Sequence, residues 1–150
     1  MGNRDTDAPQ DVHVSPRLAR LATWQLSRAS ARSHKVLHDR LAEADASGYD
    51  YRVLAVLGDL GPVSQAELGR AAMLDRRDVT HTVRALQARR LVARQPDPRD
   101  ARRMLVALTT AGRAMLARLD LVIDGVQREV FGALTADERR TLLALLQRLS

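Results

Sequence analysis

Apolar residues repeat at steps of three, four and seven along most of the chain, which predicts packed helices rather than strands. A Ser-Pro pair at 15–16 is typical of a helix start, so we expect a long first helix over 15–46. Gly48 would end that helix or start the link to the next. A short second helix is expected over 51–60, because the Gly-Pro pair at 61–62 stops it.

The next segment predicts two short helices joined by a tight turn. Residues 64–67 read Ser-Gln-Ala-Glu, a capping box that opens a third helix ending near Met73. Asp75 is a candidate N-cap for a fourth helix over 76–90. Its inward face is expected to comprise Val79, Val83 and Leu86.

A β-hairpin and two more helices complete the pattern. We expect strands over 91–94 and 104–108, and a turn over 95–102, because two prolines three residues apart do not fit inside a helix. Thr109 or Thr110 caps a fifth helix that extends to Val130. Its apolar stripe contains Met115, Leu119, Val122, Val126 and Val130. A second capping box at Thr135–Glu138 opens a last helix, with Leu142, Leu145, Leu146 and Leu149 expected to face inward.

The order of these elements predicts a fold of the mostly α class with a small β-hairpin wing. A short capped helix, a tight turn and a second helix form a helix-turn-helix. The hairpin follows it directly and would be the wing, so the winged helix-turn-helix spans 51–109. Its second helix is expected to enter the major groove of DNA with its N-terminal residues against the bases.

The charge of the chain supports nucleic acid as the partner. The 150 residues hold 24 Lys and Arg against 18 Asp and Glu, and Lys35 is the sole lysine. Arginine provides a planar set of donors that matches phosphates and guanine edges. A general arginine bias of the source is the alternative interpretation of this composition.

Candidate DNA-binding residues lie on the helix-turn-helix and on the wing. Those on the helix-turn-helix are Ser64, Gln65, Arg76, Arg77, Thr80, His81 and Arg84. Those on the wing are Arg99, Arg102 and Arg103, since a narrow minor groove attracts inserted arginine. The alternatives are a solvated helix start and a polar surface turn held by Asp97 and Asp100.

Over residues 15–150 the chain resembles the MarR family of bacterial regulators, named for multiple antibiotic resistance. The residues that carry the resemblance are Asp100 and Arg102 in an Asp-x-Arg pattern, then Leu108, Thr109 and Gly112 in a Leu-Thr-x-x-Gly pattern. The segment Leu86–Val92 also resembles the end of the family's recognition helix, except that Arg90 stands where glycine is usual.

The resemblance implies a homodimeric repressor that binds an inverted repeat in double-stranded DNA. It implies that Arg102 enters the minor groove while Asp100 steadies the wing. It also makes the helices over 15–46 and 110–150 the dimerisation helices. Independent support for a dimer comes from the fifth helix, whose apolar residues cover more than one face: Leu116, Leu119, Ile123 and Val126.

The resemblance further implies a small aromatic or anionic effector in a cleft between the first, second and fifth helices. The candidate lining residues are Arg20, Trp24, Arg28, His34, His38, Tyr49 and Tyr51. The alternatives are that Trp24 is a core residue, that the face with Arg28, Arg32 and Lys35 is solvated surface, and that His34 and His38 are a solvated or dimer-facing pair. The histidine spacing could also hold a metal ion, but we expect no metal and no cofactor.

The sequence argues against several classes of protein. The sequence has no cysteine, no phosphate-binding glycine loop and no Gly-x-Ser-x-Gly motif, so we expect no enzyme. No apolar run is long enough to span a membrane, residues 1–14 are expected to be a disordered arm without a leader, and the protein is expected in the cytoplasm. The alternative function is a winged-helix module for protein interaction or DNA architecture without an effector. A regulator that acts constitutively, without any ligand, is a third possibility.

Overall fold

The computed structural model describes residues 15–149, so the predicted disordered arm at 1–14 lies outside the described residues. The helices and strands are, in chain order, α1 (Pro16–Ala19), α2 (Ala22–Glu43), α3 (Gly48–Leu60), β1 (Val63–Ser64), α4 (Gln65–Ala72), α5 (Arg76–Ala88), β2 (Val92–Asp97), β3 (Asp100–Leu108), α6 (Thr110–Phe131) and α7 (Ala136–Gln147). This arrangement confirms the mostly α class with a β-hairpin wing and the helix-turn-helix within it.

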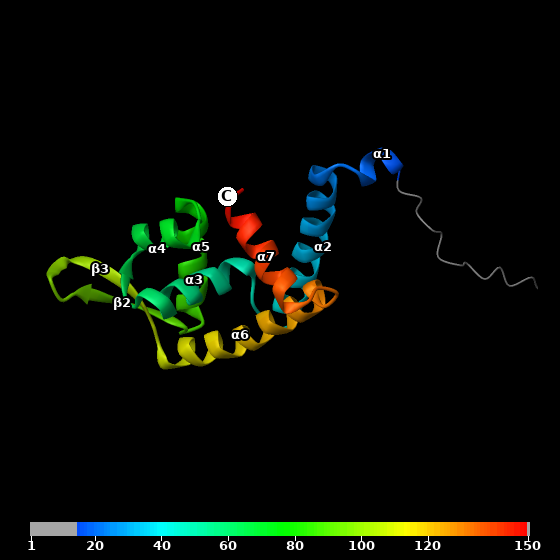
Figure 1. Cartoon of the computed structure of the whole chain (residues 1–150). Helices are drawn as coiled ribbons and strands as arrows, with labels where there is room; N and C mark the ends of the chain where they lie inside the picture. The colour runs from blue at the N-terminus through cyan, green and yellow to red at the C-terminus, as the bar shows by residue number, and fades with distance from the viewer. Residues whose placement is uncertain (1–14, 150) are drawn as a thin grey trace, which may run out of the picture.

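Helix α6 joins two parts of the molecule (Figure 1). At one end of α6 lie helices α3 to α5 and the hairpin of β2 and β3, and α2 and α7 stand toward the other end. The antiparallel sheet has the strand order β1-β3-β2, so the hairpin gains a third, very short strand that the sequence did not predict.

The core forms where α3, α5 and α6 pack together. Leu54 of α3, Leu86 of α5 and Leu119 of α6 are fully buried in it. The predicted inward face of the fourth helix, with Val79, Val83 and Leu86, is therefore confirmed.

The first helix was predicted as one unit, and this is wrong. The chain leaves helical geometry at Leu21, so α1 and α2 are separate helices. The backbone of Leu21 is extended, with φ −88° and ψ 117°, and the Gln25 side chain donates to the carbonyl of Ala19 at 2.9 Å across the break. The C-terminal boundary is also earlier than 46, because α2 ends at Glu43 and Asp45 adopts a left-handed backbone with φ 55°.

Gly48 begins α3 instead of ending the first helix, so the second helix starts three residues before the predicted Tyr51. A capping box that the sequence analysis overlooked explains this start. The Ser47 hydroxyl accepts from the Asp50 amide at 3.1 Å, and the Asp50 carboxylate accepts from the Ser47 amide at 2.8 Å.

The hairpin is longer than predicted, because β2 and β3 extend through most of the segment assigned to a turn. Pro96 lies inside β2, with a register shift between Pro96 and Asp97. A proline is tolerated there because β2 is an edge strand, whose outward amides need no partner strand.

Leu145 of α7 and Leu149, which lies two residues past the end of α7, were predicted to face inward, which is wrong for the single chain. They are 50% and 75% exposed. Within residues 15–149, no other part of the chain covers these two side chains.

Candidate nucleic-acid interface

The helix-turn-helix owes its geometry to caps at both helix starts. Ser64 is the N-cap of α4 and exchanges hydrogen bonds with Glu67, as the sequence predicted. Asp75 is the N-cap of α5, and its carboxylate accepts from the Asp78 amide at 2.7 Å. Between the helices Met73 adopts a left-handed backbone with φ 53°, which turns the chain sharply.

The outward side of α5 carries an exposed positive surface. Arg76, Arg77, His81 and Arg84 are exposed and line one hollow together with Asp75, Asp78 and Thr80. Within the described part of the chain, no ion pair occupies Arg76, Arg77 or Arg84. Their guanidinium groups therefore remain available to phosphates and base edges.

Gln65 and Thr80, both predicted to bind DNA, contact each other across the two helices. The Gln65 Nε2 donates to Thr80 Oγ1 at 2.7 Å, and Thr80 Oγ1 donates to the carbonyl of Arg76 at 2.6 Å. Arg94 of β2 donates through Nη2 to Gln65 Oε1 at 2.7 Å. Sequence reasoning missed Arg94, since no local pattern indicates that a strand residue reaches the start of α4.

Aspartates order the tip of the wing. Asp97 Oδ1 accepts from the Arg99 amide at 2.9 Å, and Asp100 Oδ1 accepts from the Arg102 amide at 3.0 Å. These are local turns in which a short acidic side chain replaces a backbone acceptor. The side chains of Arg99 and Arg102 stay exposed on the resulting hairpin.

Arg103 differs from the other two wing arginines. Its Nη2 lies 3.6 Å from Glu67 Oε2, so it faces the helix-turn-helix. The bonds from the Ser64 hydroxyl and amide, aided by the charge of Arg103, hold the pKa of the Glu67 carboxyl below its ordinary value. Two predicted DNA-binding residues, Ser64 and Arg103, thus hold this carboxylate in the free chain.

The Leu-Thr-x-x-Gly segment is the junction between the wing and α6. Thr109 Oγ1 accepts from the Gly112 amide at 2.9 Å and bonds to the carbonyl of Arg90 at 2.7 Å. A Cβ atom on Gly112 would lie 1.9 Å from the carbonyl oxygen of Leu91, so the backbones approach too closely for any other residue. Arg90, at the glycine-favoured position, adopts a left-handed backbone with φ 59°.

The structure does not gather the predicted effector residues into one contact network. In the described residues, no hydrogen bond or ion pair joins any two of them. The residues concerned are Arg20, Trp24, Arg28, His34, His38, Tyr49 and Tyr51, and all but the half-buried Tyr51 are exposed in this chain.

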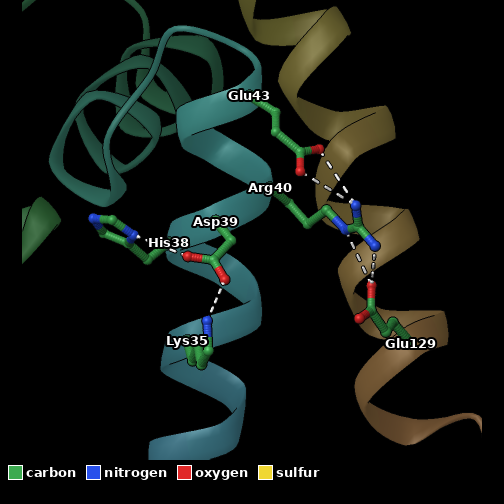
Figure 2. Close-up of polar contacts among 6 residues, drawn as sticks. All are labelled: Lys35, His38, Asp39, Arg40, Glu43 and Glu129. Carbon is green, nitrogen blue, oxygen red and sulfur yellow. Dashed lines mark hydrogen bonds and ion pairs between the residues drawn. The ribbon is translucent and has the colours of Figure 1, made fainter. Parts of the chain in front are cut away.

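Three of the predicted effector residues have partners elsewhere. The guanidinium carbon of Arg52 lies over the Tyr49 ring, 5.9 Å from its centre. The Tyr51 hydroxyl donates to Asp120 of α6 at 3.1 Å, and burial, followed by this bond, raises the pKa of the phenol. His38 Nδ1 lies 3.4 Å from Asp39 (Figure 2).

Arg40 links α2 to α6, which the sequence analysis also missed. Its Nη2 and Nε donate to one carboxylate oxygen of Glu129 at 2.9 and 3.1 Å, while Nη1 faces Glu43 (Figure 2). The ion pairs are solvent-exposed, so they contribute little to stability. Their main effect is to fix the side chain of Arg40 between the two helices.

Comparison with family models and comparison with known protein sequences give consistent matches. The family model described as the MarR family matches residues 46–103, which include the helix-turn-helix and most of the wing. The HTH-type transcriptional repressor NicR of Pseudomonas putida is 32% identical over 124 residues, which cover 83% of this chain and 78% of NicR.

Solved structures share the fold over most of the chain. One is a structure of Bordetella bronchiseptica BpsR that concerns the regulation of its DNA binding by 6-hydroxynicotinic acid. It has a TM-score of 0.78 and 27% identity to this chain, and the match covers 87% of this chain and 94% of that one. Another is a mutant MarR from E. coli complexed with operator DNA, with TM-score 0.74, 26% identity, and coverage of 83% and 90%. Together with the helix-turn-helix and wing described above, these similarities show that the chain belongs to the MarR family of transcriptional regulators.

Proposed function

We propose that this chain is a homodimeric repressor that binds an inverted-repeat operator and is released from it by a small aromatic or anionic molecule. Helix α5 would enter the major groove with Arg76, Arg77, Thr80, His81 and Arg84, and the wing would place Arg102 in the minor groove. The observation that carries this proposal is the row of exposed arginines on α5, which have no acidic partner in the described residues.

A dimer is supported by the apolar surface left exposed at the other end of the molecule. Large side chains there include Leu21, Trp24, Leu26, Leu143, Leu145 and Leu149. An exposed apolar surface of this kind marks an interaction site. A second copy would cover it and hold two recognition helices at the spacing of successive major grooves.

The experiment that tests DNA binding uses arginine variants. Arg77→Ala and Arg84→Ala should each weaken operator binding, by about 1–3 kcal/mol where the arginine contacts a base. Arg89→Ala is the matched control, because Arg89 is also exposed but lies past the last turn of α5. Equal affinity for specific and scrambled duplexes would instead support the architectural module.

The effector part is supported by the structural relative whose DNA binding is regulated by 6-hydroxynicotinic acid. We expect the site between α2, α3 and α6, with binding rather than catalysis as the role of its residues. Titration of 6-hydroxynicotinate or salicylate should change Trp24 fluorescence and lower operator affinity by about 5- to 150-fold per site. Binding without any effect on the DNA complex would contradict this part alone.

Because its proposed ligand is DNA, we expect the protein to act in the cytoplasm.

In residues 15–149, no helix combines the length and the apolar character that crossing a bilayer requires.

A further inference from the structure

Arg94, Gln65 and Thr80 form a chain of hydrogen bonds whose direction is fixed by the arginine. A guanidinium group has donors and no acceptor, so only the oxygen of the Gln65 amide can face Arg94. The nitrogen of that amide then necessarily faces Thr80, 2.7 Å away. Arg94 therefore fixes the orientation of the Gln65 amide.

The roles of the Thr80 hydroxyl as donor and acceptor follow in the same way. It accepts from Gln65, and it gives its own hydrogen to the carbonyl of Arg76 at 2.6 Å. Thr80 has no hydrogen left to donate to a base. The direct readout at this point of the surface thus falls to Gln65, which is half-buried and retains one N–H and one oxygen lone pair.

A donor and an acceptor in a fixed orientation match one base in the major groove. Adenine presents an acceptor at N7 and a donor at N6, whereas guanine presents two acceptors. Cytosine offers a donor and thymine an acceptor, so neither satisfies both groups of the amide. We propose that Gln65 is a specificity-determining residue that reads an adenine, and that Arg94 is the positioning residue that orients its amide.

This inference rests on the proposed DNA-binding function, and it assigns Arg94 a role other than phosphate binding. A phosphate contact would change affinity and salt dependence for every sequence. An orienting contact changes the preference at one base pair of each half-site. Without Arg94 the amide can turn by 180°, with the Thr80 hydroxyl donating to Gln65 Oε1 instead of to the carbonyl of Arg76, and this turn exchanges the donor and the acceptor of the amide.

The test is selection of binding sites from a randomised duplex library by the full-length protein and four variants. For the wild type, we expect one position per half-site at which adenine is preferred by about 5- to 150-fold. Gln65→Ala and Arg94→Ala should lose the preference at that same position and keep the others. Arg94→Lys should retain it, because lysine is also only a donor. Arg89→Ala is the control that should reproduce the wild-type motif.

Each of the following outcomes would overturn a stated part of the proposal. A wild-type motif that survives Gln65→Ala overturns the readout, and one that survives Arg94→Ala overturns the positioning role. A uniform loss of affinity in Arg94→Ala, with a lower salt slope and an unchanged motif, makes Arg94 a phosphate contact and overturns that role too. Absence of any motif in the wild type refutes the proposed function, and the inference with it. Circular dichroism and thermal unfolding confirm that each variant is folded before selection.

Discussion

The close contact between Gly112 and Leu91 makes Gly112→Ala a severe change at the junction of wing and α6. The new Cβ would lie 1.9 Å from the Leu91 carbonyl oxygen, whereas ordinary C···O contacts begin near about 3.3 Å. The two backbones must therefore separate by more than about 1 Å. That carbonyl accepts from the Thr109 amide and lies 3.1 Å from its hydroxyl, so both contacts are strained or lost.

The expected loss of stability follows from three contributions. Two weakened hydrogen bonds cost about 1 kcal/mol each, and overpacking costs about 1–3 kcal/mol. Alanine offsets about 1 kcal/mol through its better helix propensity. The net loss is about 2–4 kcal/mol. At about 3 °C per kcal/mol for a chain of this length, the Tm should fall by about 6–12 °C.

The assay is thermal unfolding followed by circular dichroism at one protein concentration, with two other glycines as controls. A Cβ on Gly48 would meet nothing within 4 Å, so Gly48→Ala should leave the Tm unchanged or slightly higher. At Gly58 the obstacle is Leu116 Cδ2 at 2.5 Å, the end of a side chain that can rotate, so the fall should be smaller. If Gly112→Ala unfolds with the Tm of the wild type or of Gly48→Ala, the close backbone contact is not present and the reasoning fails.

Three further predictions concern other parts of the chain. Arg90→Gly should stabilise the fold by up to about 1 kcal/mol, because Arg90 has a left-handed backbone with φ 59°; a lower Tm than wild type would contradict this. Arg102→Ala should weaken DNA binding and reduce the slope of log affinity against log salt concentration by about one unit. Fluorescence anisotropy at salt concentrations from about 50 to about 300 mM measures this slope. An unchanged slope would show that Arg102 does not contact a phosphate. Bonds from the Thr135 amide and hydroxyl lower the pKa of Glu138 from 4.5, so its contribution to stability is present above pH 4.5 and is lost as the pH falls through the lower folded value. In Glu138→Gln the urea midpoint should depend less on pH between pH 4.5 and that lower value, and identical pH profiles for both proteins would contradict the cap.

Local chemistry explains why much of the fold could be predicted from sequence. The caps at Ser64, Asp75, Thr109 and Thr135 each start a helix as predicted, because a cap depends on residues within one turn of each other. The same locality made the outward residues of α5 predictable as exposed, since its buried Val79, Val83 and Leu86 fix the opposite face.

The missed features depend on distant segments. Arg94 meets Gln65 across 29 positions, and Arg40 meets Glu129 across 89. Pro96 is compatible with a strand only because β2 lies at the edge of the sheet, which is a fact of topology. The break at Leu21 lies in a stretch, 15–40, without a fully buried side chain, which the repeat of apolar residues did not reveal.

The contacts of α6 indicate how a change in the dimer would reach DNA. Tyr51 of α3 bonds to Asp120, Gly58 of α3 packs closely against Leu116, and the wing is held to the start of α6 at Gly112. The winged helix-turn-helix is thus attached to α6 at three levels, and we expect the two to move together. A shift in the angle between α6 and the dimer partner would then displace α5 as a rigid part. Because both recognition helices must fit their half-sites at once, a displacement of a few ångströms is enough to lower operator affinity, by no more than the free energy with which a ligand prefers the displaced state.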